Sequence, residues 1–203
     1  MIYIFDLDGT LIDSSERMYR LFCDLIPECS LLKEEYWNYK RNKVNHKKLI
    51  EILYPQLNFE VFNNQWMSLI EDKHYLAMDK NYPDTIKVLS KLKANDNDLY
   101  LLTARQSKKA LMEELETLKL LDFFNVVLTT EDRQSKEDVL LEYARSNDNI
   151  LNKENIFVSD MGKDIQLGNR FSFYTVGISH GFVTEEKLKK YSPKRVIKEL
   201  SEL

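Results

Sequence analysis

Short apolar runs alternate along this chain with longer segments of helical spacing. The runs cover residues 2–5, 99–102, 125–128, 155–158 and 173–178. Because they are short and apolar without alternation, they predict strands that are buried on both faces. Between the later runs, apolar residues recur three and four positions apart, which predicts amphipathic helices. A last helix is expected to begin at Ser192, with Val196, Ile197 and Leu200 apolar. Strands that alternate with helices require a parallel sheet with right-handed crossovers, so we expect an α/β fold.

Residues 14–80 keep a helical pattern throughout and show no strand-like alternation. Apolar positions at helical spacing include Leu21, Phe22, Leu49, Ile50, Phe62 and Trp66. We therefore predict an all-helical subdomain at 14–80, inserted into a core made of residues 1–13 and 81–203. No Gly- or Ser-rich linker flanks the insertion, so we expect two short hinges, near residues 13–15 and 79–84.

The overall composition narrows the class of protein. The chain has 203 residues, of which 43% are hydrophobic and 31% charged, and its formal net charge is −4. This acidic balance argues against a nucleic-acid partner. The first apolar run stops at Asp6 and is preceded by no basic region, which argues against a signal peptide, and no run is long enough to cross a bilayer. We expect a cytoplasmic protein with no membrane partner, in which Cys23 and Cys29 are reduced. No feature of the sequence requires an oligomer, so we expect a monomer.

Polar side chains interrupt the predicted strands at their carboxyl ends. Asp6 and Asp8 follow the first strand, Thr103 follows the second and Asp160 the fourth. Lys136 begins a helix after the third strand. The carboxyl ends of parallel strands share one edge of a sheet, so we expect these side chains to converge. Each has an ordinary explanation when taken alone, such as an Asp-Gly turn or a helix cap, but a chance placement of all of them on one edge is improbable.

The residue types at this edge favour a divalent cation and a phosphoryl group. Asp6 and Asp8 repel each other unless a cation or a shared proton relieves them. Mg²⁺ prefers oxygen ligands, keeps several waters and shares phosphate oxygens, whereas the further ligands of a calcium loop are missing here. The hydroxyl of Thr103 and the ammonium of Lys136 suit a phosphoryl group, because one donates a hydrogen bond and the other neutralises charge.

Four segments resemble the signatures of the haloacid dehalogenase superfamily of phosphatases and phosphotransferases. The first is Asp6-Leu7-Asp8-Gly9-Thr10-Leu11, and the second is Leu101-Leu102-Thr103-Ala104-Arg105. Lys136 is the best candidate for the third, and the fourth begins at Ser159-Asp160-Met161-Gly162-Lys163-Asp164. The helical insertion is similar to the small cap of the phosphoglycolate phosphatase and β-phosphoglucomutase branch. The resemblance thus implies a Rossmann-like core of parallel strands flanked by helices, with a helical cap subdomain.

Three positions depart from the family pattern. Ser159 replaces the usual Gly or acid, Asp84 stands where a Gly often follows the Pro, and Lys136 lacks the customary Pro after it. The departures concern the assignment of Lys136 and the residues around the expected metal ion. They do not affect Asp6, which the resemblance implies is the nucleophile.

The resemblance implies a role for each matching residue. Asp6 would attack phosphorus and form an aspartyl phosphate, while Asp8 would act as general acid and base. Thr103, Ala104 and Lys136 would bind the substrate phosphate. Mg²⁺ would be held by Asp6, Asp8 and Asp160, with Asp8 contributing its backbone carbonyl. Asp164 would orient Lys136 or a metal-bound water.

The expected function is a Mg²⁺-dependent phosphatase that acts on a small phosphorylated metabolite. Two alternatives stay open, a phosphomutase of the β-phosphoglucomutase type and a catalytically silent binding protein. The substrate cannot be read from the sequence. Residues 36–48, which contain a basic run and His46, are the segment in which we expect contact with an anionic substrate, although a solvated surface is the simpler interpretation. The aromatic residues of the insertion are expected to form its core.

Overall fold

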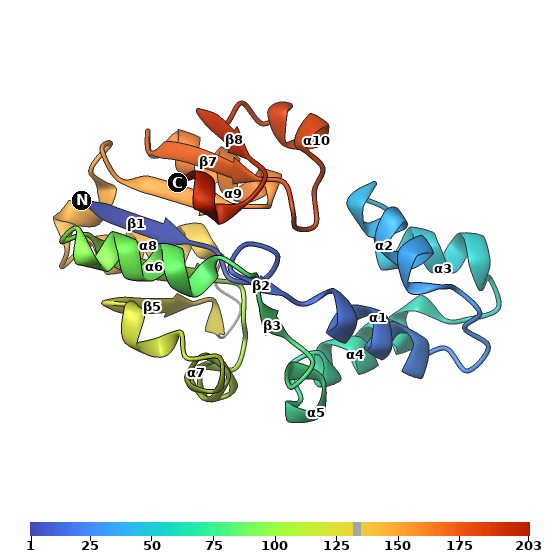
Figure 1. The fold of residues 1–203 in the computed structure, drawn as a ribbon. Coiled ribbons are helices and arrows are strands. Elements are labelled where there is room, and N and C mark those ends of the chain that lie inside the picture. Colours follow the sequence, from blue (N-terminus) through green and yellow to red (C-terminus); the bar gives the residue numbers. More distant parts are fainter. Residues whose placement is uncertain (132–134) are drawn as a thin grey trace. The chain divides into compact units, whose positions relative to one another are not determined.

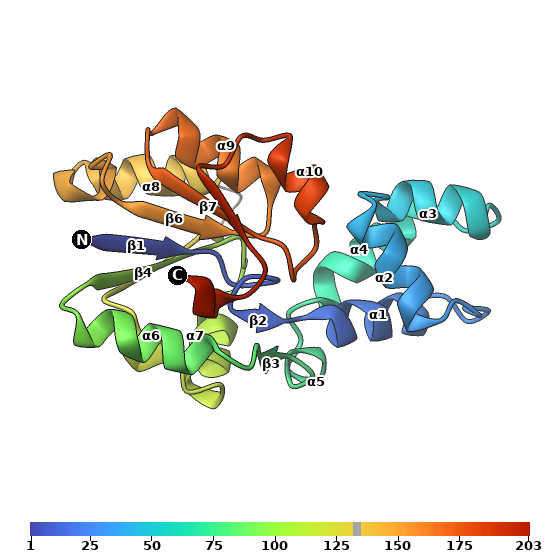
Figure 2. The same cartoon turned by 45° about the horizontal axis from the view of Figure 1, so that its top comes forward.

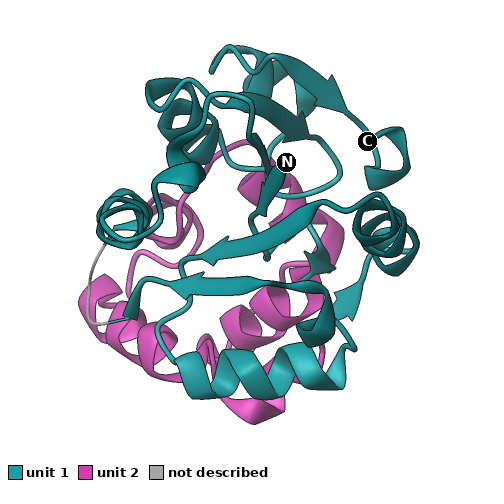
Figure 3. Cartoon of the chain, turned by 90° about the vertical axis from the view of Figure 1, so that its left-hand side faces the viewer, with its two compact units in different colours: residues 1–13, 80–203 teal, residues 14–79 magenta. Residues whose placement is uncertain are grey.

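The computed structural model describes residues 1–131 and 135–203 of the chain. They form two compact units, coloured separately in Figure 3. The α/β unit comprises Met1–Asp13 and Lys80–Leu203, and the helical unit comprises Ser14–Asp79. The sequence pattern placed the helical insertion at residues 14–80. The two units are compact bodies with cores of their own.

In the part of the chain that the structure describes, the α/β unit contains one six-stranded parallel sheet with the order β5-β4-β1-β6-β7-β8 (Figure 1). The strands are β1 (Ile2–Phe5), β4 (Asp98–Thr103), β5 (Val126–Thr129), β6 (Ile156–Ser159), β7 (Tyr174–Ile178) and β8 (Arg195–Ile197). The α/β fold predicted from the apolar runs is confirmed. In register, Phe5 pairs with Leu101 on one side and with Val158 on the other, so the residues after β1, β4 and β6 emerge at the same edge.

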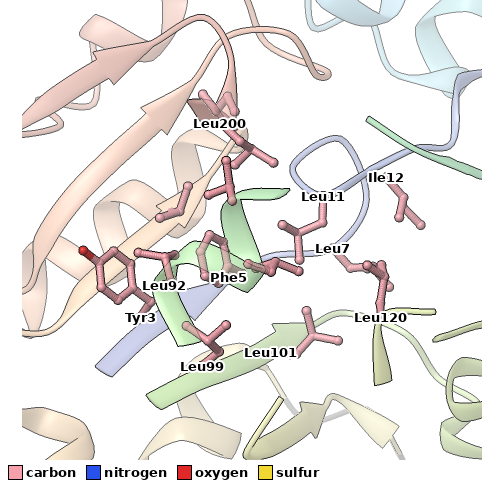
Figure 4. Packing of buried hydrophobic residues seen from close by; sticks show 14 of the residues in the cluster. Tyr3, Phe5, Leu7, Leu11, Ile12, Leu92, Leu99, Leu101, Leu120 and Leu200 are labelled. Atoms are coloured by element: carbon pink, nitrogen blue, oxygen red, sulfur yellow. The ribbon is translucent and has the colours of Figure 1, made fainter. Parts of the chain in front are cut away.

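Helices cover both faces of this sheet (Figure 2). They are α6 (Thr85–Ala94), α7 (Lys108–Thr117), α8 (Lys136–Ala144), α9 (Gly162–Arg170) and α10 (Glu185–Lys189), with short 3₁₀ turns η1 (Leu121–Phe123), η3 (Asp148–Leu151) and η4 (Leu200–Glu202). Strand residues alternate between the two faces. Tyr3 and Phe5 pack with α6 and α7 (Figure 4), whereas Ile2 and Ile4 pack with α8 and α9. Both faces of the sheet are therefore buried, which explains why the strands read as continuous apolar runs.

The helix predicted from Ser192 onward is wrong. Arg195–Ile197 form β8, which pairs with β7, and only the short turn η4 follows. Ser192 has a positive φ of 55°, and Pro193 follows it, so the chain turns at this point. The β-branched side chains of Val196 and Ile197 fit a pleated strand well.

Two further short strands lie where the sequence predicted only hinges. β2 (Ile12–Asp13) pairs antiparallel with β3 (Lys80–Asn81). Strands of two residues carry no readable period, so the sequence pattern could not indicate them. The sequence also predicts a loop over residues 129–132 after the third strand. Thr129 instead ends β5, and Asp132 lies outside the described residues.

The helical unit contains α1 (Ser15–Asp24), α2 (Lys33–Arg41), α3 (His46–Leu53), α4 (Phe59–Leu69) and α5 (Lys73–Leu76). Phe22, Tyr36, Phe62 and Trp66 are buried in its core, as the aromatic pattern predicted. The free thiols of Cys23 and Cys29 lie 2.9 Å apart in this unit. Among the described residues, no helix is both long and apolar enough to span a membrane.

Candidate active site

Asp6 occupies the position directly after β1 and is buried. Its backbone N–H donates to Val158 O at 3.0 Å, which continues the sheet by one residue. The chain then turns tightly, because Leu7 O accepts hydrogen bonds from the backbone N–H groups of Thr10, Leu11 and Ile12. Gly9 has a φ of 78°, a conformation that residues with a Cβ rarely adopt. The Asp-Gly turn therefore does form, and it holds Asp6 at the edge of the sheet.

Lys136 joins two of the predicted site carboxylates. Its ammonium donates to Asp6 Oδ1 at 2.7 Å and to Asp164 Oδ2 at 2.6 Å. Lys136 opens α8, whose first turn is capped by Ser135, and Asp164 lies in the first turn of α9. Ser159 Oγ donates to Asp164 Oδ2 at 2.9 Å and lies 3.4 Å from Asp6 Oδ2. The serine that departs from the family pattern thus contacts both carboxylates.

Asp160 is completely buried and held by neutral donors. Its Oδ2 accepts from the backbone N–H of Phe182 at 2.6 Å, and its Oδ1 accepts from Thr10 Oγ1 at 3.3 Å. The backbone N–H of Asp160 in turn donates to Thr10 Oγ1 at 3.0 Å. Two glycines enclose the carboxylate, since a Cβ on either Gly9 or Gly181 would lie 2.3 Å from Asp160 Oδ2. The carboxylate therefore fits only because both positions lack a side chain.

The charges of the acidic groups in this site shift one another's pKa values. Burial raises the pKa of Asp6 to about 7, and the charges of Asp164 and Asp8 add to the rise while Lys136 opposes it. Burial and the charge of Asp6 also raise the pKa of Asp160 well above its ordinary value. Burial lowers the pKa of Lys136, but the charges of Asp164 and Asp6 outweigh burial and hold it above its usual range. When Asp6, Asp160 and Asp164 are all ionised, the ammonium of Lys136 is the one cation that pairs with this group among the described residues.

The donor set of the site fits a magnesium ion. Within residues 1–131 and 135–203, no three His, Cys, Asp or Glu side chains are grouped so that they alone could hold a metal ion. Mg²⁺ does not require one, because it is usually bound by one or two carboxylates together with waters and phosphate oxygens. Asp6 and Asp160 are two such carboxylates, and with Asp164 they exceed the charge of Lys136 by two when ionised. A divalent cation would balance that excess.

Thr103 and Ala104 lie at the same edge of the sheet. Thr103 ends β4 and is buried, and it lies two residues beyond Leu101, which pairs with Phe5 at the end of β1. Ala104 follows it and is exposed. Both positions are therefore close in register to the turn that contains Asp6 and Asp8.

The side chain of Asp8 is hydrogen-bonded to Arg105, a residue to which the sequence analysis assigned no role. Arg105 Nε donates to Asp8 Oδ2 at 2.7 Å, and Arg105 Nη2 donates to Asp8 Oδ1 at 3.0 Å. The guanidinium also pairs with Glu114 of α7 at 3.1 Å. A signal was present, because Glu114 interrupts the apolar side of α7 between Leu111 and Leu115. An acid at such a position calls for a buried partner.

A second unanticipated pair lies beside the turn. His180 Nε2 is 3.1 Å from Thr10 O, and its ring stacks on Tyr82 with centroids 3.7 Å apart. The two rings lie against the segment that follows Asp8 and support it.

In the helical unit, part of the basic run at 36–48 packs inward. Tyr36 Oη lies 2.9 Å from His46 Nε2, and Lys40 Nζ lies 3.4 Å from the same nitrogen. Burial, with the charge of Lys40, lowers the pKa of His46 to about 2, and burial lowers the pKa of Lys40 to about 8. His46 therefore serves as a neutral hydrogen-bonding group among aromatic rings.

Comparisons with known proteins agree with this architecture. The sequence model of a family described as haloacid dehalogenase-like hydrolase matches residues 3–178. A protein named pyrophosphatase PpaX from Bacillus pumilus (strain SAFR-032) is 25% identical over 215 residues, which cover 98% of this chain and 93% of that protein.

Two solved structures illustrate the likeness of fold. A haloacid dehalogenase-like family hydrolase from Streptococcus pneumoniae gives a TM-score of 0.81 at 19% identity, covering 99% of this chain and 95% of that chain. A structure described as a predicted phosphoglycolate phosphatase from Haemophilus somnus 129pt gives a TM-score of 0.77 at 19% identity, covering 99% and 95%. At these identities the likeness shows the fold, and it covers the helical insertion as well as the sheet.

Proposed function

The chain belongs to the haloacid dehalogenase-like hydrolase family, and we propose that it is a Mg²⁺-dependent phosphatase that hydrolyses a small phosphomonoester through an aspartyl phosphate on Asp6. The observation that carries this proposal is the hydrogen bonding of Lys136 to both Asp6 and Asp164, beside the buried Asp160. This arrangement supports the proposal because it brings a carboxylate, a fixed positive charge and a surplus of anionic oxygens to one edge of a parallel sheet, where ligands of α/β proteins bind.

Mg²⁺ would be held by Asp6, Asp160 and the backbone carbonyl of Asp8, and it would screen the repulsion between the carboxylate of Asp6 and the anionic phosphoryl group. Lys136 donates a hydrogen bond to Asp6 Oδ1 and so fixes the orientation of that carboxylate. The other oxygen, Oδ2, is the one we assign to the attack on phosphorus.

The reaction would proceed in two displacements. In the first, a bond forms between Asp6 and phosphorus, the bond from phosphorus to the alcohol oxygen breaks, and Asp8 gives its proton to the departing oxygen. In the second, a water attacks phosphorus, its proton passes to Asp8, and the bond from phosphorus to Asp6 breaks. Thr103, Ala104 and Lys136 would bind the phosphoryl oxygens in both steps.

The site indicates only that the substrate carries a phosphoryl group, and it does not identify the rest of the molecule. The names of the relatives suggest candidates, because one is called a pyrophosphatase and another is described as a predicted phosphoglycolate phosphatase. We therefore include inorganic pyrophosphate and phosphoglycolate, with sugar phosphates and nucleotides, among the compounds to be tested.

The decisive experiment measures phosphate release from this panel with Mg²⁺ and with EDTA. We expect release that requires Mg²⁺ and falls below detection in Asp6→Asn, while the exposed control Lys163→Gln keeps the activity of the parent protein. Release that needs no divalent cation, or that survives in Asp6→Asn, would exclude the proposed mechanism. A requirement for a sugar bisphosphate activator would identify a phosphomutase, and tight ligand binding without turnover would identify a silent binding protein.

A further inference from the structure

The carboxylate of Asp8 is held by two parallel hydrogen bonds from a single guanidinium. Arg105 Nε and Nη2 lie 2.7 Å and 3.0 Å from the two oxygens of Asp8. Bidentate pairing of this kind fixes the direction and the plane of a carboxylate, whereas a lysine would act as a point charge. The Asp8 side chain keeps 23% of its surface exposed while that of Arg105 keeps 5%, so the arginine holds Asp8 from the protein side.

Arg105 is in turn anchored by a second acid. Glu114 accepts from Arg105 Nη2 at 3.3 Å through Oε1, and its Oε2 lies 3.1 Å from Arg105 Nη1. Glu114 is buried in the apolar face of α7. The backbone carbonyl of Arg105 accepts a hydrogen bond from Thr129 Oγ1, so the main chain at this position is also held. A buried glutamate costs stability unless it is paired, and Arg105 supplies that pairing.

We propose that Arg105 is the positioning residue for Asp8, and that Glu114 keeps Arg105 in place when Asp8 turns from the guanidinium to the substrate. The inference rests on the proposed function, in which Asp8 must deliver a proton to the leaving oxygen. Both oxygens of Asp8 accept from Arg105, and Asp8 must carry a proton to act as the acid, so we expect at least one of these hydrogen bonds to open as Asp8 turns to the leaving group. Glu114 remains as a partner of the guanidinium throughout, so the opening leaves no buried charge without a counterion.

A role in proton delivery differs from a purely structural role in its dependence on the leaving group. 4-Nitrophenolate departs without much help from an acid, whereas an alkoxide requires a proton. Mispositioning of Asp8 should therefore slow phosphoryl transfer to Asp6 from an alkyl phosphate far more than from 4-nitrophenyl phosphate. A loss of folded protein would slow both reactions by the same factor.

The test compares kcat and KM for 4-nitrophenyl phosphate and for the best alkyl phosphate in the parent protein, Arg105→Lys and Glu114→Gln, with the exposed Arg195→Lys as the matched control. We expect Arg105→Lys to shift the ratio of the two kcat/KM values by roughly 10²-fold against the alkyl phosphate, within the range of acid catalysis. This ratio reports the first displacement alone, because hydrolysis of the aspartyl phosphate is common to both substrates. Glu114→Gln should shift the ratio in the same direction by a smaller factor, and Arg195→Lys should leave it unchanged.

The possible outcomes distinguish failure of the positioning role of Arg105 from failure of the proposed phosphatase function. An active parent protein in which both variants change kcat/KM for the two substrates by the same factor, or change neither, would overturn the positioning role while leaving the phosphatase intact. A folded parent protein that releases no phosphate from any compound would overturn the proposed function and this inference with it. Should Arg105→Lys fail to fold, as judged by circular dichroism, the ratio measured in Glu114→Gln decides the question.

Discussion

Lys136 Nζ lies 2.7 Å from Asp6 Oδ1, although 130 residues separate the two in sequence. The same ammonium lies 2.6 Å from Asp164 Oδ2, and its side chain is only 12% exposed. The proposed nucleophile is therefore oriented by one buried cation that it shares with a second carboxylate.

Removal of this cation should damage activity and stability together. In Lys136→Met, Asp6 and Asp164 lose their buried counterion, which typically costs about 3–5 kcal/mol of unfolding free energy. Loss of a fixed charge at the phosphoryl group should lower kcat by about 10²-fold or more. Urea unfolding at pH 8 and phosphate release measure the two effects. Lys163→Met, an exposed lysine on α9, is the control and should change neither. An active, equally stable Lys136→Met protein would exclude this role.

The raised pKa of Asp6 predicts a pH-dependent effect of Asp6→Asn. Burial raises the pKa of Asp6 to about 7 from an ordinary value of 3.8. The native state therefore holds this proton more tightly than the unfolded chain, and the resulting stabilisation is complete below about pH 4 and disappears as the pH rises through 7. In EDTA, Asp6→Asn should match the parent protein near pH 4.5 and exceed its stability at pH 8 by up to about 4 kcal/mol.

Urea unfolding at the two pH values measures this difference. The exposed Asp98→Asn serves as the control and should show no such pH-dependent gain. A gain for Asp6→Asn that is equal at both pH values would show that ionisation of Asp6 does not limit stability.

The strand ends could be predicted from the sequence because a strand that is buried on both faces is a continuous apolar run. Asp6, Thr103 and Asp160 each break an otherwise apolar run, and the parallel topology then places them on one edge. The pairing of Asp8 with Arg105 breaks no apolar strand, because the direction of a side chain beyond a strand end depends on a partner from another element. Its one indication in the sequence, Glu114 on the apolar side of α7, does not identify the partner. The short strand at Arg195–Ile197 was missed for a related reason, since its pairing with β7 outweighs a helical spacing of only a few residues.

Addition of Mg²⁺ should stabilise the protein through Asp160. Ions that bind the native state alone raise the unfolding free energy by about 2.7 kcal/mol at a concentration 100 times the dissociation constant. Because burial and the charge of Asp6 raise the pKa of Asp160, a nearby cation should relieve the cost of ionising both groups. Thermal unfolding with and without Mg²⁺ should show an increase in Tm for the parent protein and little increase for Asp160→Asn. An equal increase in both proteins would place the ion elsewhere.

The two glycines around Asp160 and Gly177 in β7 offer a matched test of how closely the site is packed. An added Cβ at Gly181 would lie 2.2 Å from Gly9 O and 2.3 Å from Asp160 Oδ2, so the backbone on one side must move. At Gly177 the nearest atom to an added Cβ is Leu188 Cδ1 at 3.6 Å, which is an ordinary contact. Overpacking of the first kind typically costs about 1–3 kcal/mol.

We therefore expect Gly181→Ala to lose stability by that amount and to lower kcat by at least about 10-fold, because a shift of roughly 1 Å in a positioning group has effects of this size or larger. Gly177→Ala should remain within about 0.5 kcal/mol of the parent protein and keep its activity. Urea unfolding and steady-state kinetics, performed on both variants under the same conditions, provide the comparison. If the two alanines behaved alike, the close approach of the segment at Gly181 to the turn at Gly9 would have no part in holding Asp160.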